Sequence, residues 1–135
     1  MFRFSWQTIL LISISFLAHA KEQPCSPNRH ASVPALTNLT YHKARKSLLA
    51  KGWQPLQTKP YNTAADDPDV SYGNGKVFWD RGYVEVEACA GTGVSPCAFL
   101  FSDVYGTKLR VTTVGEEDSA SKAYATVSGF RFVCE

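Results

Sequence analysis

The sequence of 135 residues contains one methionine and three histidines, and it has little excess charge of either sign. Its 14 Lys and Arg residues against 12 Asp and Glu residues give a net charge of +2. Proteins that bind nucleic acids carry clusters of basic residues that contact the phosphates, so this balance argues against a nucleic-acid partner. Internal repeats and low-complexity tracts are also missing, which argues against a repeat array.

Long apolar runs are absent except near the start, where "ILLISISFLA" occupies positions 9–18. Arg3 precedes this run, and Ala18 and Ala20 stand where a signal peptidase requires small residues. The run is shorter than the roughly 20 apolar residues of a membrane span. We therefore expect residues 1–20 to be a secretory signal, cleavage of which removes Arg3 and leaves a net charge of +1 with no membrane span. A retained amphipathic anchor is the alternative.

Cysteines are few, but all four follow the predicted signal. An even number in an exported chain indicates disulfides, which leaves no free thiol as nucleophile and predicts a periplasmic or secreted location. Of the three pairings, we favour Cys89–Cys97, which closes a nine-residue loop worth about 2.6 kcal/mol in the chain-entropy model. The second bridge is then Cys25–Cys134, which ties the N-terminal tail to the last strand and is worth about 4.8 kcal/mol.

The part after the signal begins with a polar, proline-rich segment, residues 21–36, which we expect to be an extended lead-in. Residues 37–52 then repeat apolar side chains at helical spacing. Thr40 or Thr37 suits the N-cap of this helix, and Gly52 suits its end.

Strands are expected in the remainder. Residues 53–59 are predicted to form a short edge strand because Pro55 has no backbone N–H to donate. Near residue 85, valines alternate with Glu85 and Glu87, which predicts a wet face for both glutamates. Four further strands are predicted at 82–89, 97–102, 107–114 and 123–134. The predicted fold is α+β, with one N-terminal helix packed on an antiparallel sheet of four to five strands in a single domain of residues 37–135, stapled by two disulfides.

The stretch "CAGTGVSPC", residues 89–97, caps a predicted hairpin. A disulfide-stapled turn explains it fully, because glycines permit positive φ and Pro96 directs the chain into the next strand. A rigid exposed loop is also preorganised for binding, and its backbone N–H groups could hold an anion. The spacing is not that of a zinc site. The candidate binding residues are Gly91, Thr92, Gly93, Val94 and Ser95.

The loop resembles two known kinds of sequence. In length it is similar to the disulfide loops of Bowman–Birk protease inhibitors, but Gly91 would precede the scissile bond and offers a protease pocket nothing to hold. Residues 82–116 and the segment "ARKSLLAKGWQP" resemble small uncharacterised secreted proteins of proteobacteria with a Cys-x-Gly-Thr-Gly-x-x-Pro-Cys loop. That resemblance implies a bacterial exported protein and no particular activity.

A second candidate region is the acidic segment at residues 60–76, which we expect to be a long irregular loop. It contains Asp66, Asp67 and Asp69. A helix–loop–helix calcium motif counted from Asp67 fails, because Tyr72 and Phe78 occupy the positions of its glycine and its acid. A looser calcium site in this segment is the alternative to a solvated surface loop.

No other residues suggest catalysis. His30 and His42 lack the neighbours of a catalytic triad, and His42 is placed with two lysines on the polar helix face. We therefore predict a non-catalytic binding module without cofactor or metal, inhibitor-like or immunity-like towards an envelope protein. Two alternatives remain: a small-ligand or metal-binding protein or hydrolase that uses residues 60–76, and a structural envelope component.

Overall fold

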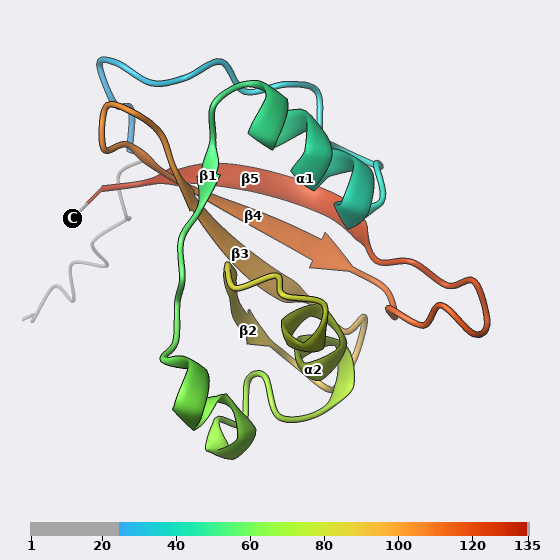
Figure 1. Cartoon of the computed structure of the whole chain (residues 1–135). Coiled ribbons are helices and arrows are strands. Elements are labelled where there is room, and N and C mark those ends of the chain that lie inside the picture. Colours follow the sequence, from blue (N-terminus) through green and yellow to red (C-terminus); the bar gives the residue numbers. More distant parts are fainter. Residues whose placement is uncertain (1–24, 135) are drawn as a thin grey trace, which may run out of the picture.

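The computed structural model describes residues 25–134 (Figure 1). The predicted signal, residues 1–20, and the start of the lead-in lie outside this range. The predicted α+β class with up to five strands is confirmed, but residues 25–134 contain two α-helices where one was predicted. The elements in chain order are α1 (Tyr41–Ala50), β1 (Gln54–Pro55), the 3-10 helix η1 (Tyr61–Asp66), α2 (Gly73–Asp80), β2 (Val86–Cys89), β3 (Cys97–Ser102), β4 (Lys108–Val114) and β5 (Thr126–Val133).

Strand β3 is the centre of an antiparallel sheet. It pairs with β4 along one edge, and β4 pairs with β5. The other edge of β3 is shared, because β1 pairs with its end at Ser102 and β2 pairs with its start at Cys97. Pro55 therefore lies in an edge strand, as predicted. Both helices lie over the same face of the sheet (Figure 1).

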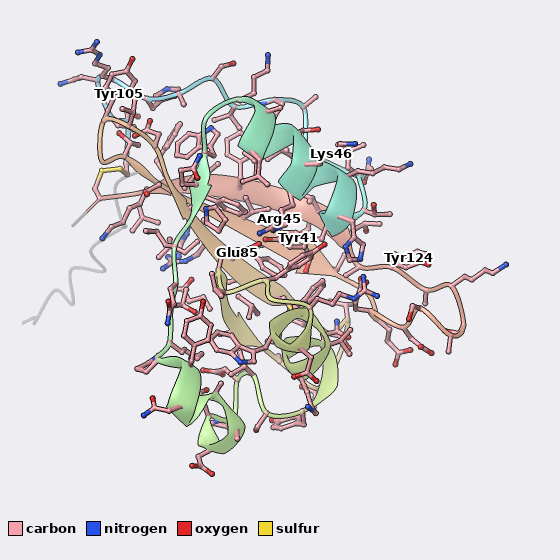
Figure 2. The ribbon with its side chains drawn as sticks, viewed as in Figure 1. Tyr41, Arg45, Lys46, Glu85, Tyr105 and Tyr124 are labelled. Atoms are coloured by element: carbon pink, nitrogen blue, oxygen red, sulfur yellow. A yellow bond between two sulfur atoms is a disulfide. The ribbon has the colours of Figure 1, made fainter. Side chains whose placement is uncertain are left out.

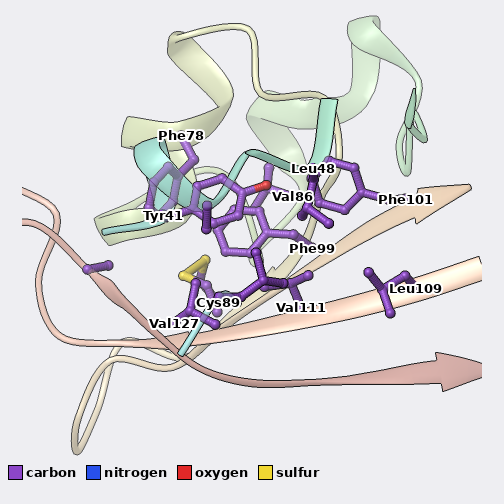
Figure 3. Close-up of a cluster of buried hydrophobic side chains, with 14 of the residues drawn as sticks. Tyr41, Leu48, Phe78, Val86, Cys89, Phe99, Phe101, Leu109, Val111 and Val127 are labelled. Carbon is purple, nitrogen blue, oxygen red and sulfur yellow. A yellow bond between two sulfur atoms is a disulfide. The ribbon is translucent and has the colours of Figure 1, made fainter. Parts of the chain in front are cut away.

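The core lies between this face and the two helices (Figure 3). Alternation along β3 buries Phe99 and Phe101, and alternation along β4 buries Leu109 and Val111. The ring of Tyr41 from α1 stacks on Phe99 with 3.6 Å between the ring centroids. The two disulfides that we favoured, Cys25–Cys134 and Cys89–Cys97, are both present, with Cα–Cα distances of 5.6 and 4.1 Å.

Helix α1 is shorter than its apolar repeat suggests. The backbone just before it is used by β5: Asn38 donates to the Val127 carbonyl at 2.9 Å, and the Val127 amide donates to Leu39 at 2.8 Å. The helix begins only after this pairing, with Thr40 as N-cap, and Gly52 after its end takes a φ of +91°. Of the two predicted N-caps, Thr40 is confirmed and Thr37 is not, and the predicted terminator Gly52 is confirmed.

The expectation of an irregular loop over residues 60–76 is also wrong, because this segment contains η1 and the first turn of α2. Two glycines in the first turn of α2 disfavour a helix when the sequence is considered alone. Packing overrides that preference. Gly75 is buried, and an added Cβ there would lie 2.0 Å from the Asp69 carbonyl oxygen. Only glycine lets α2 approach the preceding segment this closely.

Strand β2 departs from the predicted alternation. It begins at Val86 because residues 83–86 form a turn in which the Val86 amide donates to the Tyr83 carbonyl. A register shift between Val86 and Ala88 then breaks the period of two. As a result Glu85 is fully buried, which corrects the predicted wet face, while Glu87 pairs with Arg110 at 2.7 Å. The two carboxylates have separate partners.

Among residues 25–134, no helix has the length and apolar character that crossing a membrane requires.

Candidate functional site

The disulfide loop, residues 90–96, is the most exposed of the predicted sites. Residues 91–94 are exposed, and the Val94 side chain, 64% exposed, is among the larger apolar groups in contact with solvent. Ser95 is half-buried. The structure thus exposes four of the five candidate binding residues, all but Ser95.

This loop is held from several sides. The Ala90 amide donates to the Pro96 carbonyl at 2.9 Å, which closes the loop above the disulfide. The Gly115 amide donates to the Val94 carbonyl at 2.7 Å, and the Asn74 Nδ2 donates to the Ser95 carbonyl at 3.4 Å. These bonds join the loop to the connection after β4 and to the start of α2. The loop conformation is therefore set before any partner arrives.

A groove of about 580 Å³ opens between the disulfide loop, α2 and the connection that follows β4. Gly91 and Ser95 line it from the loop, Asn74 and Val77 from α2, and residues 116–118 from the connection. The disulfide loop is therefore bordered by a concave surface. Grooves of this size commonly bind small molecules or side chains of partner proteins.

Asn74 joins the three walls of this groove. Its Nδ2 donates to the Gly115 carbonyl at 2.8 Å, and its Oδ1 accepts from the Glu117 amide at 2.9 Å. Sequence reasoning missed Asn74 and Glu117, because an isolated Asn in a loop and an acid in a polar connection give no signal of this role. The bonds from Asn74 to Gly115 and to Glu117 join residues more than 40 positions apart in the chain.

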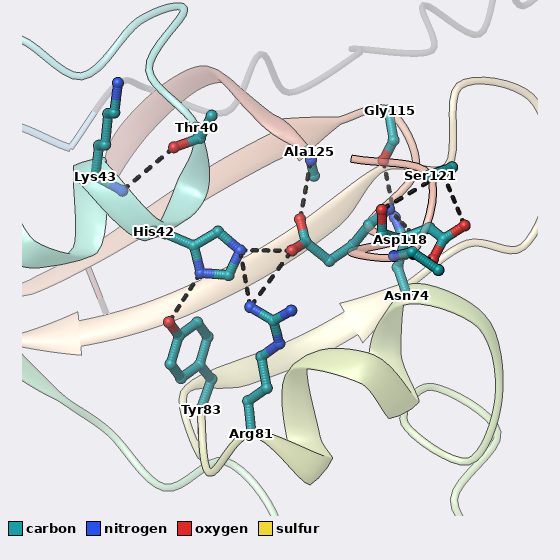
Figure 4. A network of polar contacts seen from close by, with 12 residues as sticks. Thr40, His42, Lys43, Asn74, Arg81, Tyr83, Gly115, Asp118, Ser121 and Ala125 are labelled. Atoms are coloured by element: carbon teal, nitrogen blue, oxygen red, sulfur yellow. Dashed lines mark hydrogen bonds and ion pairs between the residues drawn. The ribbon is translucent and has the colours of Figure 1, made fainter. Parts of the chain in front are cut away.

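Beside the groove, His42 of α1 forms a closed polar network (Figure 4). Its Nε2 lies 2.5 Å from Glu117 Oε1, and its Nδ1 lies 2.9 Å from the Tyr83 hydroxyl. The other Glu117 oxygen accepts from the Ala125 amide at 3.0 Å, and Arg81 lies 3.8 Å from Oε1. Both nitrogens of His42 are bonded within the protein, so neither is directed at a substrate. His42 was predicted on the polar helix face with two lysines, and the structure shows its ring half-buried in this network instead of surrounded by solvent.

A second network surrounds the buried Glu85 (Figure 2). The Tyr41 hydroxyl donates to Glu85 Oε1 at 2.8 Å, and Arg45 Nε donates to the same oxygen at 2.6 Å. The Arg45 guanidinium carbon lies 4.4 Å from the centre of the Tyr83 ring. This network fixes α1 against the turn that precedes β2, and it lies in the core rather than in the groove.

Burial raises the pKa of Tyr41 well above its ordinary value of 10.0, and the charge and the hydrogen bond of Glu85 raise it further. A raised pKa in the folded state means that this contribution to stability is complete below the unfolded pKa of about 10 and is lost as the pH rises through the folded value. We expect the free energy of unfolding to fall above about pH 10, and to fall less steeply in Tyr41→Phe. Denaturant unfolding of both proteins between neutral and alkaline pH measures this difference, and parallel pH profiles would contradict it.

A single lysine pairs with two of the three acids of the segment 60–76. Lys59 Nζ lies 2.9 Å from an Asp67 carboxylate oxygen and 3.5 Å from one of Asp69. The hydrogen bond from Lys59, followed by that from the Asp69 amide, lowers the pKa of Asp67. Asp66 is exposed at the end of η1. In the described part of the chain, no three His, Cys, Asp or Glu side chains are grouped as a metal site would require.

Comparisons of the chain with models of known families, with curated proteins and with solved structures each found no match. The inferences about function therefore rest on the residues and geometry described above.

Proposed function

We propose that this protein is a secreted, non-catalytic binding module, and that its contact surface is the disulfide loop together with the adjoining groove. The observation that carries the proposal is the combination of exposure and restraint in the loop. Val94 is 64% exposed, although its carbonyl is fixed by Gly115 and its flanking cysteines are bridged. Such a loop loses little conformational entropy on binding, so more of the contact energy is left for affinity.

An aromatic side chain extends this surface. Tyr72, which precedes α2, is 57% exposed, and a Cβ added to Gly91 would lie 3.2 Å from its ring. The ring therefore rests on the loop backbone, where a larger residue than glycine would displace it. Exposed aromatic and aliphatic groups on a rigid support are the usual anchors of protein–protein interfaces. Tyr72 and Val94 fit that role.

The polar groups nearby support a binding role rather than a catalytic one. Asn74, His42 and Glu117 are bonded to one another or to backbone groups, which makes them supports of the groove wall. Disulfides form and persist in oxidising compartments outside the cytosol, so the two bridges favour a partner in the cell envelope. An inhibitor or immunity protein of an envelope enzyme is the form of binding module that we propose.

The test is affinity capture with a matched pair of variants. The oxidised protein is immobilised and exposed to envelope extract, and the same is done with Val94→Lys and Val104→Lys. Val104 is 85% exposed in the turn after β3, outside the loop and groove, so it controls for a new charge at an exposed valine. We expect Val94→Lys to lose the partner, by about 2 kcal/mol or more of binding free energy, and Val104→Lys to retain it. Equal capture by both variants would refute the proposed surface.

A further inference from the structure

We infer that the groove beside the disulfide loop receives a positively charged side chain, arginine or lysine, of the partner protein. This inference rests on the proposed function and names the chemistry by which the same surface recognises its partner. It depends on the charges around the groove, on the groove's shape and apolar wall, and on the way its walls are fixed.

Negative charge dominates the groove. Four of the residues that line it are acidic, namely Asp80, Glu116, Glu117 and Asp118, whereas Lys76 is the only cationic lining residue within residues 25–134. Two of the four acids are already paired: Lys76 Nζ lies 2.7 Å from Asp80, and the buried Glu117 carboxylate contacts His42 and lies 3.8 Å from Arg81. Glu116 is exposed and makes no ion pair or hydrogen bond with a described residue. A cation that enters therefore meets the carboxylates of Glu116 and Asp118, with which no cationic side chain of residues 25–134 pairs.

The shape and the walls of the groove suit a long side chain with a charged end. Its volume of about 580 Å³ exceeds what one side chain fills, and Val77, Ala90 and Gly91 supply apolar surface along it. Lysine and arginine place their methylene stems on such surface while the charged end reaches polar groups. Arginine is also among the residues enriched in the energetic centre of interfaces. An acidic side chain would be repelled by the carboxylates, and a purely apolar side chain would leave them without a partner.

The walls are already in position for this contact. Glu117 is 3% exposed, and its carboxylate is fixed by His42 and by the Ala125 amide. Asp118 accepts hydrogen bonds from the Ala120 amide at 2.9 Å and from the Ser121 hydroxyl at 2.7 Å. Glu117 therefore fixes the wall from within the protein, and Asp118 is held in place beside the exposed Glu116, so little rearrangement is needed before a cation binds.

The probe is the blocked tripeptide acetyl-Ala-Arg-Ala-amide, with the citrulline peptide as a control that has nearly the same shape and no charge. Both are titrated into the isotopically labelled protein while its backbone amide signals are followed by NMR. We expect the arginine peptide to shift the signals of Asn74, Gly91 and Glu116, and to bind about fivefold more tightly than the citrulline peptide. Glu116→Lys should weaken the arginine peptide by at least that factor, whereas Asp66→Lys, an equal charge reversal on the exposed end of η1, should not.

Three results would overturn the inference: no shifts at the groove, equal binding of the two peptides, or unchanged binding to Glu116→Lys. The capture experiment separates this inference from the proposed function. If the partner is lost from Val94→Lys but binds Glu116→Lys with unchanged affinity, the proposed binding module is supported and the inference of a charged side chain in the groove is refuted. If the arginine peptide binds the groove but neither the unmodified protein nor any variant captures a protein, the proposed function is refuted instead.

Discussion

Replacing Gly75 with alanine is expected to lower the free energy of unfolding by about 3 kcal/mol or more. The added methyl group would lie 2.0 Å from the Asp69 carbonyl oxygen and 3.0 Å from the Val70 Cα. These are backbone atoms, so a side-chain rotation cannot relieve the clash, and α2 or the preceding segment has to move. Alanine favours a helix over glycine by only about 1 kcal/mol, which is too little to offset this cost.

Gly129 provides the matched control for this substitution. It lies in β5, where the nearest atom to an added Cβ would be the Thr112 Oγ1 at 3.9 Å, an ordinary contact. Gly129→Ala should therefore change stability by less than about 1 kcal/mol. Guanidinium unfolding followed by tryptophan fluorescence measures both variants. Similar midpoints for Gly75→Ala and the unmodified protein would mean that α2 does not pack against Asp69 as described.

Removal of the Cys25–Cys134 disulfide is expected to cost more stability than removal of Cys89–Cys97. The first bridge joins residues 109 apart and the second joins residues 8 apart. In the chain-entropy model the long closure contributes about 4.8 kcal/mol and the short one about 2.6 kcal/mol, and measured losses usually fall at or below such values. The variant without Cys25 and Cys134 should therefore melt at a lower temperature than the variant without Cys89 and Cys97.

The two variants should differ in the opposite direction in their binding of the partner. The variant without Cys89–Cys97 loses a restraint on the disulfide loop and should capture the partner poorly, although it is the more stable of the two. The variant without Cys25–Cys134 retains the loop and should bind wherever it remains folded. Calorimetry and capture on the same two proteins test both rankings. A larger stability loss from the short loop would contradict the entropic explanation.

Much of the fold follows from local sequence patterns. Helix α1 was predictable because Thr40, Leu48 and Gly52 mark its start, its buried face and its end within one short segment. Strands β3 and β4 were predictable because their alternation is unbroken. In contrast, α2 depends on a contact between Gly75 and Asp69 that no helix propensity reports.

The candidate site also has one part that the sequence predicts and one part that it does not. The disulfide loop was visible as two cysteines around small residues, and its exposure followed from the hairpin. The groove beside it was not visible, because it depends on pairs such as His42 and Glu117 that lie 75 residues apart. Glu85 was misplaced because a turn and a register shift, both invisible to a period of two, reverse the face on which it lies.

The end-to-end disulfide makes the described chain a covalent ring, since Cys25 and Cys134 lie at the two limits of residues 25–134. A protease that cuts one peptide bond inside a ring opens it without releasing a fragment. Nicking of the exposed residues 119–122, for example, would leave one molecule held together by the bridge and by the sheet. Surfaces of this protein can therefore survive a single cleavage, and such damage would become visible only after reduction.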